Sequence, residues 1–175
     1  MNSGDYPLKN IVLIGMPGAG KSTMGVILAK TLGRNLSILL SWHRKQPESS
    51  CEEIIDDKGT AAFLETEEKT ILPLYGHNAV IATGGSVVFS EKAMKPLKKD
   101  GVVIYPAAPV REWSGDSRNI TTRGIVLVAG QSLRDLYNQR IPFYEKYADR
   151  TIDCSDGDFE KCIGNVIDGL PAFRG

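Results

Sequence analysis

The sequence has few of the residues that build metal centres and disulfide frameworks. It contains three cysteines and two histidines among 175 residues. Cys51, Cys154 and Cys162 are widely spaced and odd in number, so they form neither a disulfide framework nor a zinc-binding pattern. We expect them to be reduced thiols in a cytosolic protein. His43 and His77 have no ligand partner nearby in the sequence, which argues against a metal cluster or histidine-based catalysis.

An excess of charge of one sign is also missing. The chain has 21 Lys and Arg residues against 21 Asp and Glu residues, so its net charge is zero. This balance argues against a dedicated nucleic-acid or membrane-surface binder. No stretch is long and apolar enough to cross a membrane, and residues 1–9 lack the apolar core of a secretion signal. We therefore expect a cytoplasmic protein and a monomer.

What the sequence does contain is a complete phosphate-binding loop. Residues 15–22 read GMPGAGKS and fit the pattern G-x-x-x-x-G-K-[ST] in full. An apolar run at 10–14 suits a buried strand before the loop, and 22–32 has helical spacing after it. The alternative is a tight glycine turn that binds nothing.

This motif predicts how a nucleotide is held. Backbone N–H groups of the loop and the N-terminus of the following helix would bind phosphate oxygens. Lys21 would reach the β- and γ-phosphates, and the Ser22 hydroxyl would ligate Mg²⁺. The predicted nucleotide-binding residues are Gly15, Gly18, Ala19, Gly20, Lys21, Ser22 and Thr23.

Strand-like and helix-like segments alternate along the rest of the chain. Further strands are predicted at 36–40, 79–82, 102–105 and around 151–152, and helices at 52–74, 91–99, 132–147 (interrupted at Pro142) and 159–170. The alternation predicts a single α/β domain with a five-stranded parallel sheet and helices on both faces. Ligands bind beyond the carboxyl ends of such strands, so the phosphate loop and Thr83-Gly84-Gly85 can face one cleft.

Residues 111–131 break this alternation. They carry Arg111, Arg118 and Arg123 among several glycines. In a protein that handles ATP, such a segment suggests a lid that closes over the phosphates. An ordinary solvated insertion is the alternative.

Three classes of phosphate-loop protein compete. A GTPase would be supported by D-x-x-G at 56–59, but the guanine-reading motif N-K-x-D is absent. A motor or transporter ATPase usually needs a larger chain and an apolar strand that ends in acidic residues. A small-molecule kinase fits the compact chain, the second glycine-rich strand end and the arginine-bearing segment best.

The chain resembles the shikimate kinase family over residues 11 to 154, approximately. The resemblance rests on an ordered set of motifs: the signature at 11–23, Gly59 with Phe63 and Glu67, Thr83-Gly84-Gly85, Arg123, and the RIPFY element at 140–144. It implies a three-layer P-loop kinase fold over 1–175 with a lid at 111–131. It also implies transfer of the γ-phosphoryl group of ATP to the 3-hydroxyl of shikimate, with Mg²⁺.

The resemblance implies a role for individual residues. Lys21 and Arg123 would be catalytic, with Arg123 closing on the phosphates and spreading the developing charge. Arg140 would grip the carboxylate of a small hydroxy acid in fork geometry. Gly84 and Gly85 would let the backbone approach the substrate ring.

The sequence departs from the family pattern at three positions. Ile38 and Leu40 stand where the family has the two carboxylates of D-x-D, and Leu64 replaces an arginine. The missing carboxylates would help to hold the metal and accept the hydroxyl proton, and loss of a general base costs ~10²–10⁴ in rate. Three interpretations therefore remain: a shikimate kinase, a kinase for another small hydroxy acid, and a catalytically weak ATP-binding regulatory protein.

Overall fold

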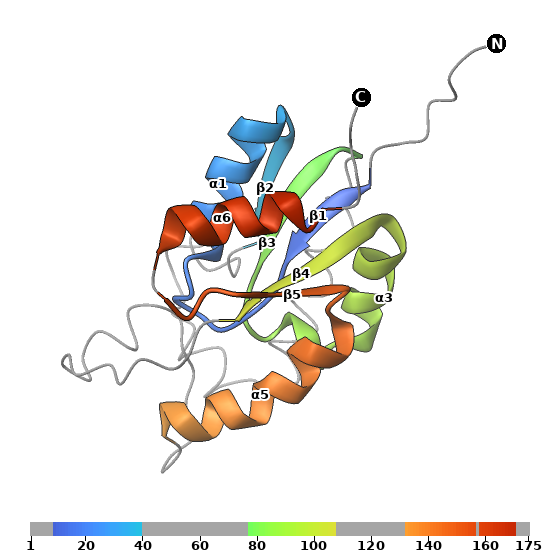
Figure 1. Cartoon of the computed structure of the whole chain (residues 1–175). Helices are drawn as coiled ribbons and strands as arrows, with labels where there is room; N and C mark the ends of the chain where they lie inside the picture. Colours follow the sequence, from blue (N-terminus) through green and yellow to red (C-terminus); the bar gives the residue numbers. More distant parts are fainter. Residues whose placement is uncertain (1–8, 40–76, 108–131, 157, 171–175) are drawn as a thin grey trace, which may run out of the picture.

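The fold is built on one parallel sheet. The computed structural model describes residues 9–39, 77–107, 132–156 and 158–170. Five strands lie in the order β2-β3-β1-β4-β5, and every pairing is parallel (Figure 1). The strands are β1 (Asn10–Leu13), β2 (Asn35–Leu39), β3 (Ala79–Thr83), β4 (Gly101–Ala107) and β5 (Arg150–Asp153).

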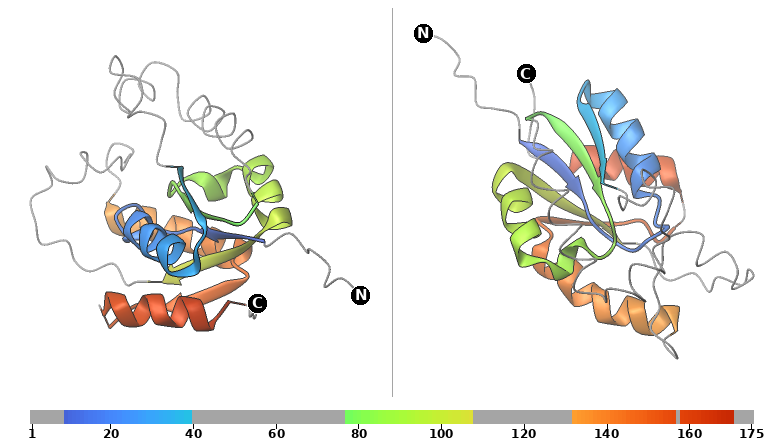
Figure 2. Two further views of the ribbon diagram at one scale, coloured as in Figure 1. Left: turned by 90° about the horizontal axis from the view of Figure 1, so that it is seen from above. Right: turned by 180° about the vertical axis from the view of Figure 1, so that it is seen from behind.

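Helices cover both faces of this sheet. The described helices are α1 (Lys21–Leu32), α3 (Glu91–Asp100), α5 (Leu133–Tyr147) and α6 (Phe159–Asp168), with a short 3₁₀ helix, η2 (Val87–Phe89). Helices α1 and α6 lie on one side of the sheet, and α3 and α5 lie on the other (Figure 2). This arrangement confirms the three-layer α/β fold that the sequence predicts.

The central strand β1 contributes to both hydrophobic cores. Ile11 and Leu13 pack with residues of α1 and α6, whereas Val12 and Ile14 pack with residues of α3 and α5. All four side chains have no exposed surface. Side chains alternate between the two faces of a strand, and a parallel sheet is covered on both faces, so the strand reads as a continuous apolar run.

The predicted strands and the closing helix agree with the structure to within two residues at each end, but helix α5 differs from the expectation. It runs from Leu133 to Tyr147 without a break, although it contains Pro142. Proline removes one helical N–H, but the residues on both sides of it are held by packing. Arg140 and Tyr144 are buried, and Phe143 packs against the core beneath α5. Tertiary packing therefore outweighs the local effect of the proline.

The cysteines also differ from the expectation of reduced thiols. Cys154 and Cys162 form a disulfide, with Cα atoms 5.3 Å apart. Their positions differ by eight along the chain, and no spacing pattern in the sequence links them. They meet because β5 leads directly into α6, which folds back along the sheet. Cys51 lies outside the described residues.

Other predictions fall partly or wholly outside the described part of the chain. The expected helix at 52–74 and the expected lid at 111–131 are among them. Within the residues that the structure describes, no helix is long and apolar enough to span a membrane.

Candidate active site

The phosphate loop connects β1 to α1 at the carboxyl end of the central strand. Gly15, Gly18 and Gly20 have φ angles of 142°, 76° and 77°, in the region that only glycine adopts readily. The Ala19 amide donates to the Met16 carbonyl over 3.2 Å, which closes the turn. Since β1 lies between β3 and β4, the loop opens at the point where ligands bind in such sheets.

Helix α1 begins without a side-chain cap. Its N-cap residue, Gly20, adopts a left-handed conformation and offers no side-chain acceptor to the first-turn N–H groups. By contrast, Ser90, Ser132 and Asp158 cap α3, α5 and α6. The first N–H groups of a helix need an acceptor, and a phosphate at a helix N-terminus supplies one. The start of α1 is therefore chemically suited to an anion.

Lys21 lies inside the loop. Its ammonium group donates to the carbonyl oxygens of Gly15 and Met16 over 2.8 and 2.7 Å, and its side chain is buried. Burial, and secondarily the nearby positive charge of Arg140, lowers the pKa of Lys21 from 10.5 to about 7. A bound anion beside this amine would stabilise its protonated form.

The glycine turn after β3 packs directly on the phosphate loop. A Cβ atom on Gly85 would lie 2.5 Å from Cδ of Pro17 and 2.9 Å from Nη1 of Arg140, so no larger residue fits there. Just before it, the buried Thr83 hydroxyl donates to the Leu13 carbonyl over 2.8 Å. The structure thus brings together the loop and the Thr83-Gly84-Gly85 segment, as the strand order requires.

Arg140 reaches the same place from helix α5. The residue is only 7% exposed, and its Nε and Nη1 atoms are buried without a hydrogen-bond partner. Its Cζ atom lies 5.6 Å from the centre of the Phe89 ring. Buried polar groups normally have partners, so a guanidinium with two unsatisfied donors is suited to bind an anionic group of a ligand.

Tyr144 joins these segments, a role that the sequence does not predict. Its hydroxyl donates to the Gly85 carbonyl over 2.7 Å and lies 3.8 Å from Sδ of Met16. Burial raises the pKa of Tyr144 to about 12, although the charge and hydrogen bonding of Arg140 act in the opposite direction. In the sequence, Tyr144 is the last residue of the RIPFY element, one helical turn after Arg140.

The end of β2 is apolar in this part of the chain. Ile38 stands level with Ala82 of β3 in the sheet and is 40% exposed. Leu40, Leu64 and Arg123 lie outside the described residues. The position where the family has its first carboxylate therefore presents an aliphatic side chain.

Ser22 and Thr23 occupy the first turn of α1, where Ser22 is half-buried and Thr23 is exposed. Among the residues that the structure describes, no group of three or more His, Cys, Asp or Glu side chains could hold a metal ion. A hydroxyl at this position is suited to a magnesium ion that is held mainly by nucleotide phosphates and water.

Known proteins are similar to this chain in sequence and in architecture. The family model "Shikimate kinase" matches residues 17–170. The shikimate kinase of Thermodesulfovibrio yellowstonii is 36% identical over 163 residues, which cover 91% of this chain and 94% of that protein. A structure of shikimate kinase from Acinetobacter baumannii in complex with shikimate has a TM-score of 0.78 at 29% identity and covers 92% of each chain.

A second group of relatives is longer. Threonine synthase-like 1 from Mus musculus is 34% identical over 169 residues, which cover 95% of this chain and 23% of that protein. The chain thus spans 23% of the length of the threonine synthase-like 1 proteins that it matches. The matches to full-length shikimate kinases and to the family model agree with the fold and the ordered motifs. The chain belongs to the shikimate kinase family.

Proposed function

We propose that the protein is an ATP-dependent kinase that phosphorylates a hydroxyl group of a small carboxylic acid, with shikimate as the leading acceptor. One observation carries the proposal: an uncapped, glycine-rich phosphate loop packs against a buried arginine with two unsatisfied donors. The phosphate loop is suited to bind phosphates, and the buried arginine is suited to bind a carboxylate. Membership of the shikimate kinase family implies ATP as the phosphoryl donor.

The nucleotide end acts through position and charge. The proposed contacts are the backbone of residues Gly15, Gly18, Ala19 and Gly20 and the first turn of α1 at Ser22 and Thr23. Lys21 would exchange its two carbonyl partners for phosphate oxygens, whose negative charge favours the protonated amine. Phosphoryl transfer depends mostly on such positioning and on neutralisation of charge.

Mg²⁺ belongs to this proposal. When bound, the ion would neutralise charge on the phosphates. Ser22 is the residue that would hold it, because its hydroxyl in the first turn of α1 fits an ion that is otherwise coordinated by phosphates and water.

The acceptor end would be formed by Arg140, Gly84 and Gly85. Arg140 would bind the acceptor carboxylate through its two unsatisfied N–H groups, and Gly85 would keep the backbone close to the ligand. Arg123, which lies outside the described residues, is assigned by the family resemblance to the spreading of charge on the transferred group. We treat residues 1–175 as one P-loop kinase domain with a lid at 111–131, acting as a cytoplasmic monomer on a small molecule.

Ile38 favours a second candidate function. An aliphatic side chain at the end of β2 supplies neither a proton acceptor nor a metal contact. The same fold could then phosphorylate a less polar hydroxy acid, or bind ATP in a regulatory role with little catalysis.

Acceptor-dependent release of ADP separates these functions. The purified protein is incubated with Mg²⁺ and ATP alone, with shikimate, and with a panel of other hydroxy acids, and ADP is measured by a coupled assay. Shikimate-dependent turnover supports the leading proposal, and turnover with another acid supports a change of acceptor. Binding of Mg·ATP by calorimetry without turnover supports the regulatory role. Absence of nucleotide binding by folded protein contradicts all three.

A further inference from the structure

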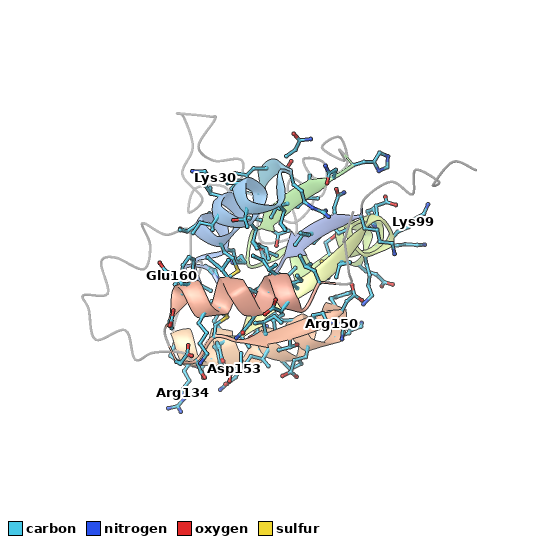
Figure 3. The ribbon with its side chains drawn as sticks, turned by 45° about the horizontal axis from the view of Figure 1, so that its top comes forward. Lys30, Lys99, Arg134, Arg150, Asp153 and Glu160 are labelled. Carbon is cyan, nitrogen blue, oxygen red and sulfur yellow. A yellow bond between two sulfur atoms is a disulfide. The ribbon has the colours of Figure 1, made fainter. Side chains whose placement is uncertain are left out.

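We propose that Cys154 and Cys162 form a reversible thiol–disulfide site that sets the affinity of the phosphate loop for its nucleotide. The inference rests on the proposed function, because it concerns a nucleotide bound at that loop. The disulfide joins the residue after β5 to the second turn of α6. Figure 3 labels Asp153 at the end of β5 and Glu160 in the first turn of α6. These two residues mark the parts of the chain that the bond connects.

The bridged elements touch the phosphate loop. A Cβ atom on Gly20 would lie 3.0 Å from Cε2 of Phe159, the first residue of α6. A small cavity of about 80 Å³ is lined by Ala19 of the loop together with Phe159 and both cysteines. A change in the connection between β5 and α6 therefore acts on the residues that begin helix α1.

The two cysteines differ in exposure, which indicates how the bond can be opened. Cys162 is 3% exposed and belongs to the core beneath α6, whereas Cys154 is half-buried at its edge. The thiolate of a small dithiol can therefore attack Sγ of Cys154 and form a mixed disulfide as the Cys154–Cys162 bond breaks. Cys162 leaves as a thiolate and takes a proton from water.

The second thiol group of the reductant completes the exchange. As a thiolate, it attacks the reductant's other sulfur, which is bonded to Sγ of Cys154 in the mixed disulfide. The Cys154 thiolate is released and takes up a proton. In total, one protein disulfide and one dithiol become two protein thiols and one cyclic disulfide, with two electrons passed to the protein. A small-molecule disulfide reverses the reaction.

The bond affects nucleotide affinity through preorganisation. Ile163 and Val166 anchor α6 in the core beyond its first turn, so that part of the helix stays in place without the bond. Opening the bond instead loosens the first turn of α6, where Phe159 lies against Gly20. A cross-link removes conformational freedom from the segment that it closes, and a preorganised site loses less entropy on binding. The oxidised protein is therefore the tighter nucleotide binder.

The test compares the two redox states of one protein. The Cys51→Ser variant of the full chain, which cannot form other pairs, is prepared oxidised and reduced with dithiothreitol, and each state is verified by its mass difference of about two daltons. Calorimetry with Mg·ATP then gives both dissociation constants. We expect the reduced form to bind about three- to tenfold more weakly.

Two variants assign the effect. Adding Cys154→Ser should give one affinity, equal to that of the reduced form, under both conditions. Phe159→Leu, which keeps the disulfide but shortens the contact with Gly20, should shrink the difference between the states. Phe159→Leu thus gives a readout that does not require loss of the bond.

Four results are decisive. Affinities that differ by less than a factor of about two overturn the redox inference and leave the proposed function intact. Failure of the oxidised protein to form the 154–162 bond does the same. An undiminished difference in Phe159→Leu overturns the proposed route through Phe159. Absence of nucleotide binding in both states overturns the proposed function and the inference together.

Discussion

The two ends of the candidate active site are built in different ways. At the proposed nucleotide end, the backbone supplies the donors: three glycines with positive φ and an uncapped helix present N–H groups. At the proposed acceptor end, the Arg140 side chain comes from α5 and lies against Gly85, which follows β3. A backbone site tolerates change in neighbouring side chains, whereas each loss at a side-chain site removes a function. Of the three departures from the family pattern, Ile38 lies within the described residues, at the end of β2.

Replacement of Lys21 should have the largest effect, because the Lys21 amine is buried inside the phosphate loop. Lys21→Ala should lower kcat by ~10²–10³, the typical cost of removing one charge-stabilising donor. Lys30→Ala, an exposed position on the last turn of the same helix, is the matched control. Steady-state rates of ADP formation measure both. Unchanged activity in Lys21→Ala would remove the phosphate loop from the mechanism.

Arg140→Lys should affect the acceptor end alone. The charge is kept but the fork geometry is lost, and we expect a cost of about 2 kcal/mol, roughly 30-fold in the KM of the acceptor. The KM of ATP should change far less. Arg134→Lys, on the exposed first turn of α5 (labelled in Figure 3), is the control. Equal changes in both KM values would show that Arg140 serves the nucleotide end as well.

Restoration of the missing carboxylates should raise activity, in contrast to the two losses described above. The double change Ile38→Asp and Leu40→Asp should raise shikimate turnover at least about tenfold, because a general base is worth ~10²–10⁴ when fully aligned. Leu36→Asp, which lies on the same strand and is also partly exposed, controls for added negative charge. If turnover does not rise, the aliphatic end of β2 is not what limits catalysis.

The buried amine of Lys21 should make stability depend on pH. Its pKa is about 7 in the folded protein against an ordinary value of 10.5, so the unfolded chain binds more protons between these values. The free energy of unfolding therefore rises with pH through this window, by at most about 1.4 kcal/mol per pH unit. The destabilisation is full below pH 7 and fades toward pH 10.5.

Comparison with a variant isolates this contribution. Urea unfolding at about pH 7.5 and 9.0, without nucleotide or phosphate, should show that the wild type gains about 2 kcal/mol more than Lys21→Met. Other groups titrate alike in both proteins. Equal gains would mean that the amine keeps its ordinary pKa in the folded protein.

Tyr144→Phe should have the smallest effect, because one hydrogen bond to Gly85 is lost while the ring stays packed. We expect a loss of about 1 kcal/mol, near fivefold in kcat/KM for the acceptor. Tyr147→Phe, three residues further along α5, is the control. An effect confined to thermal stability would assign Tyr144 to the core and not to the site.

The sequence predicted the parts of this molecule that depend on local pattern. The apolar runs of β1 and β3, the loop at 15–22 and their alternation with helices are local signals, and the structure confirms the strands that they predict. Two features were not predicted from the sequence because they depend on tertiary packing. Helix α5 continues through Pro142 where the core holds it, and Cys154 meets Cys162 only once β5 and α6 are folded together.

The same reason limited the prediction of the site. Family resemblance singled out Arg140, but no local pattern reveals that its guanidinium lies over Phe89 and against Gly85. The contact of Phe159 with Gly20 likewise joins the two ends of the chain. Such contacts arise from strand order, which brings distant segments to one edge of the sheet.

Strand β1 is short, yet every one of its residues is buried. It pairs with β3 on one side and β4 on the other, and it shares side chains with both helical layers. Local opening of a protein starts where burial is least, so this strand separates only when the whole domain does. The phosphate loop is consequently attached to the part of the domain that unfolds last.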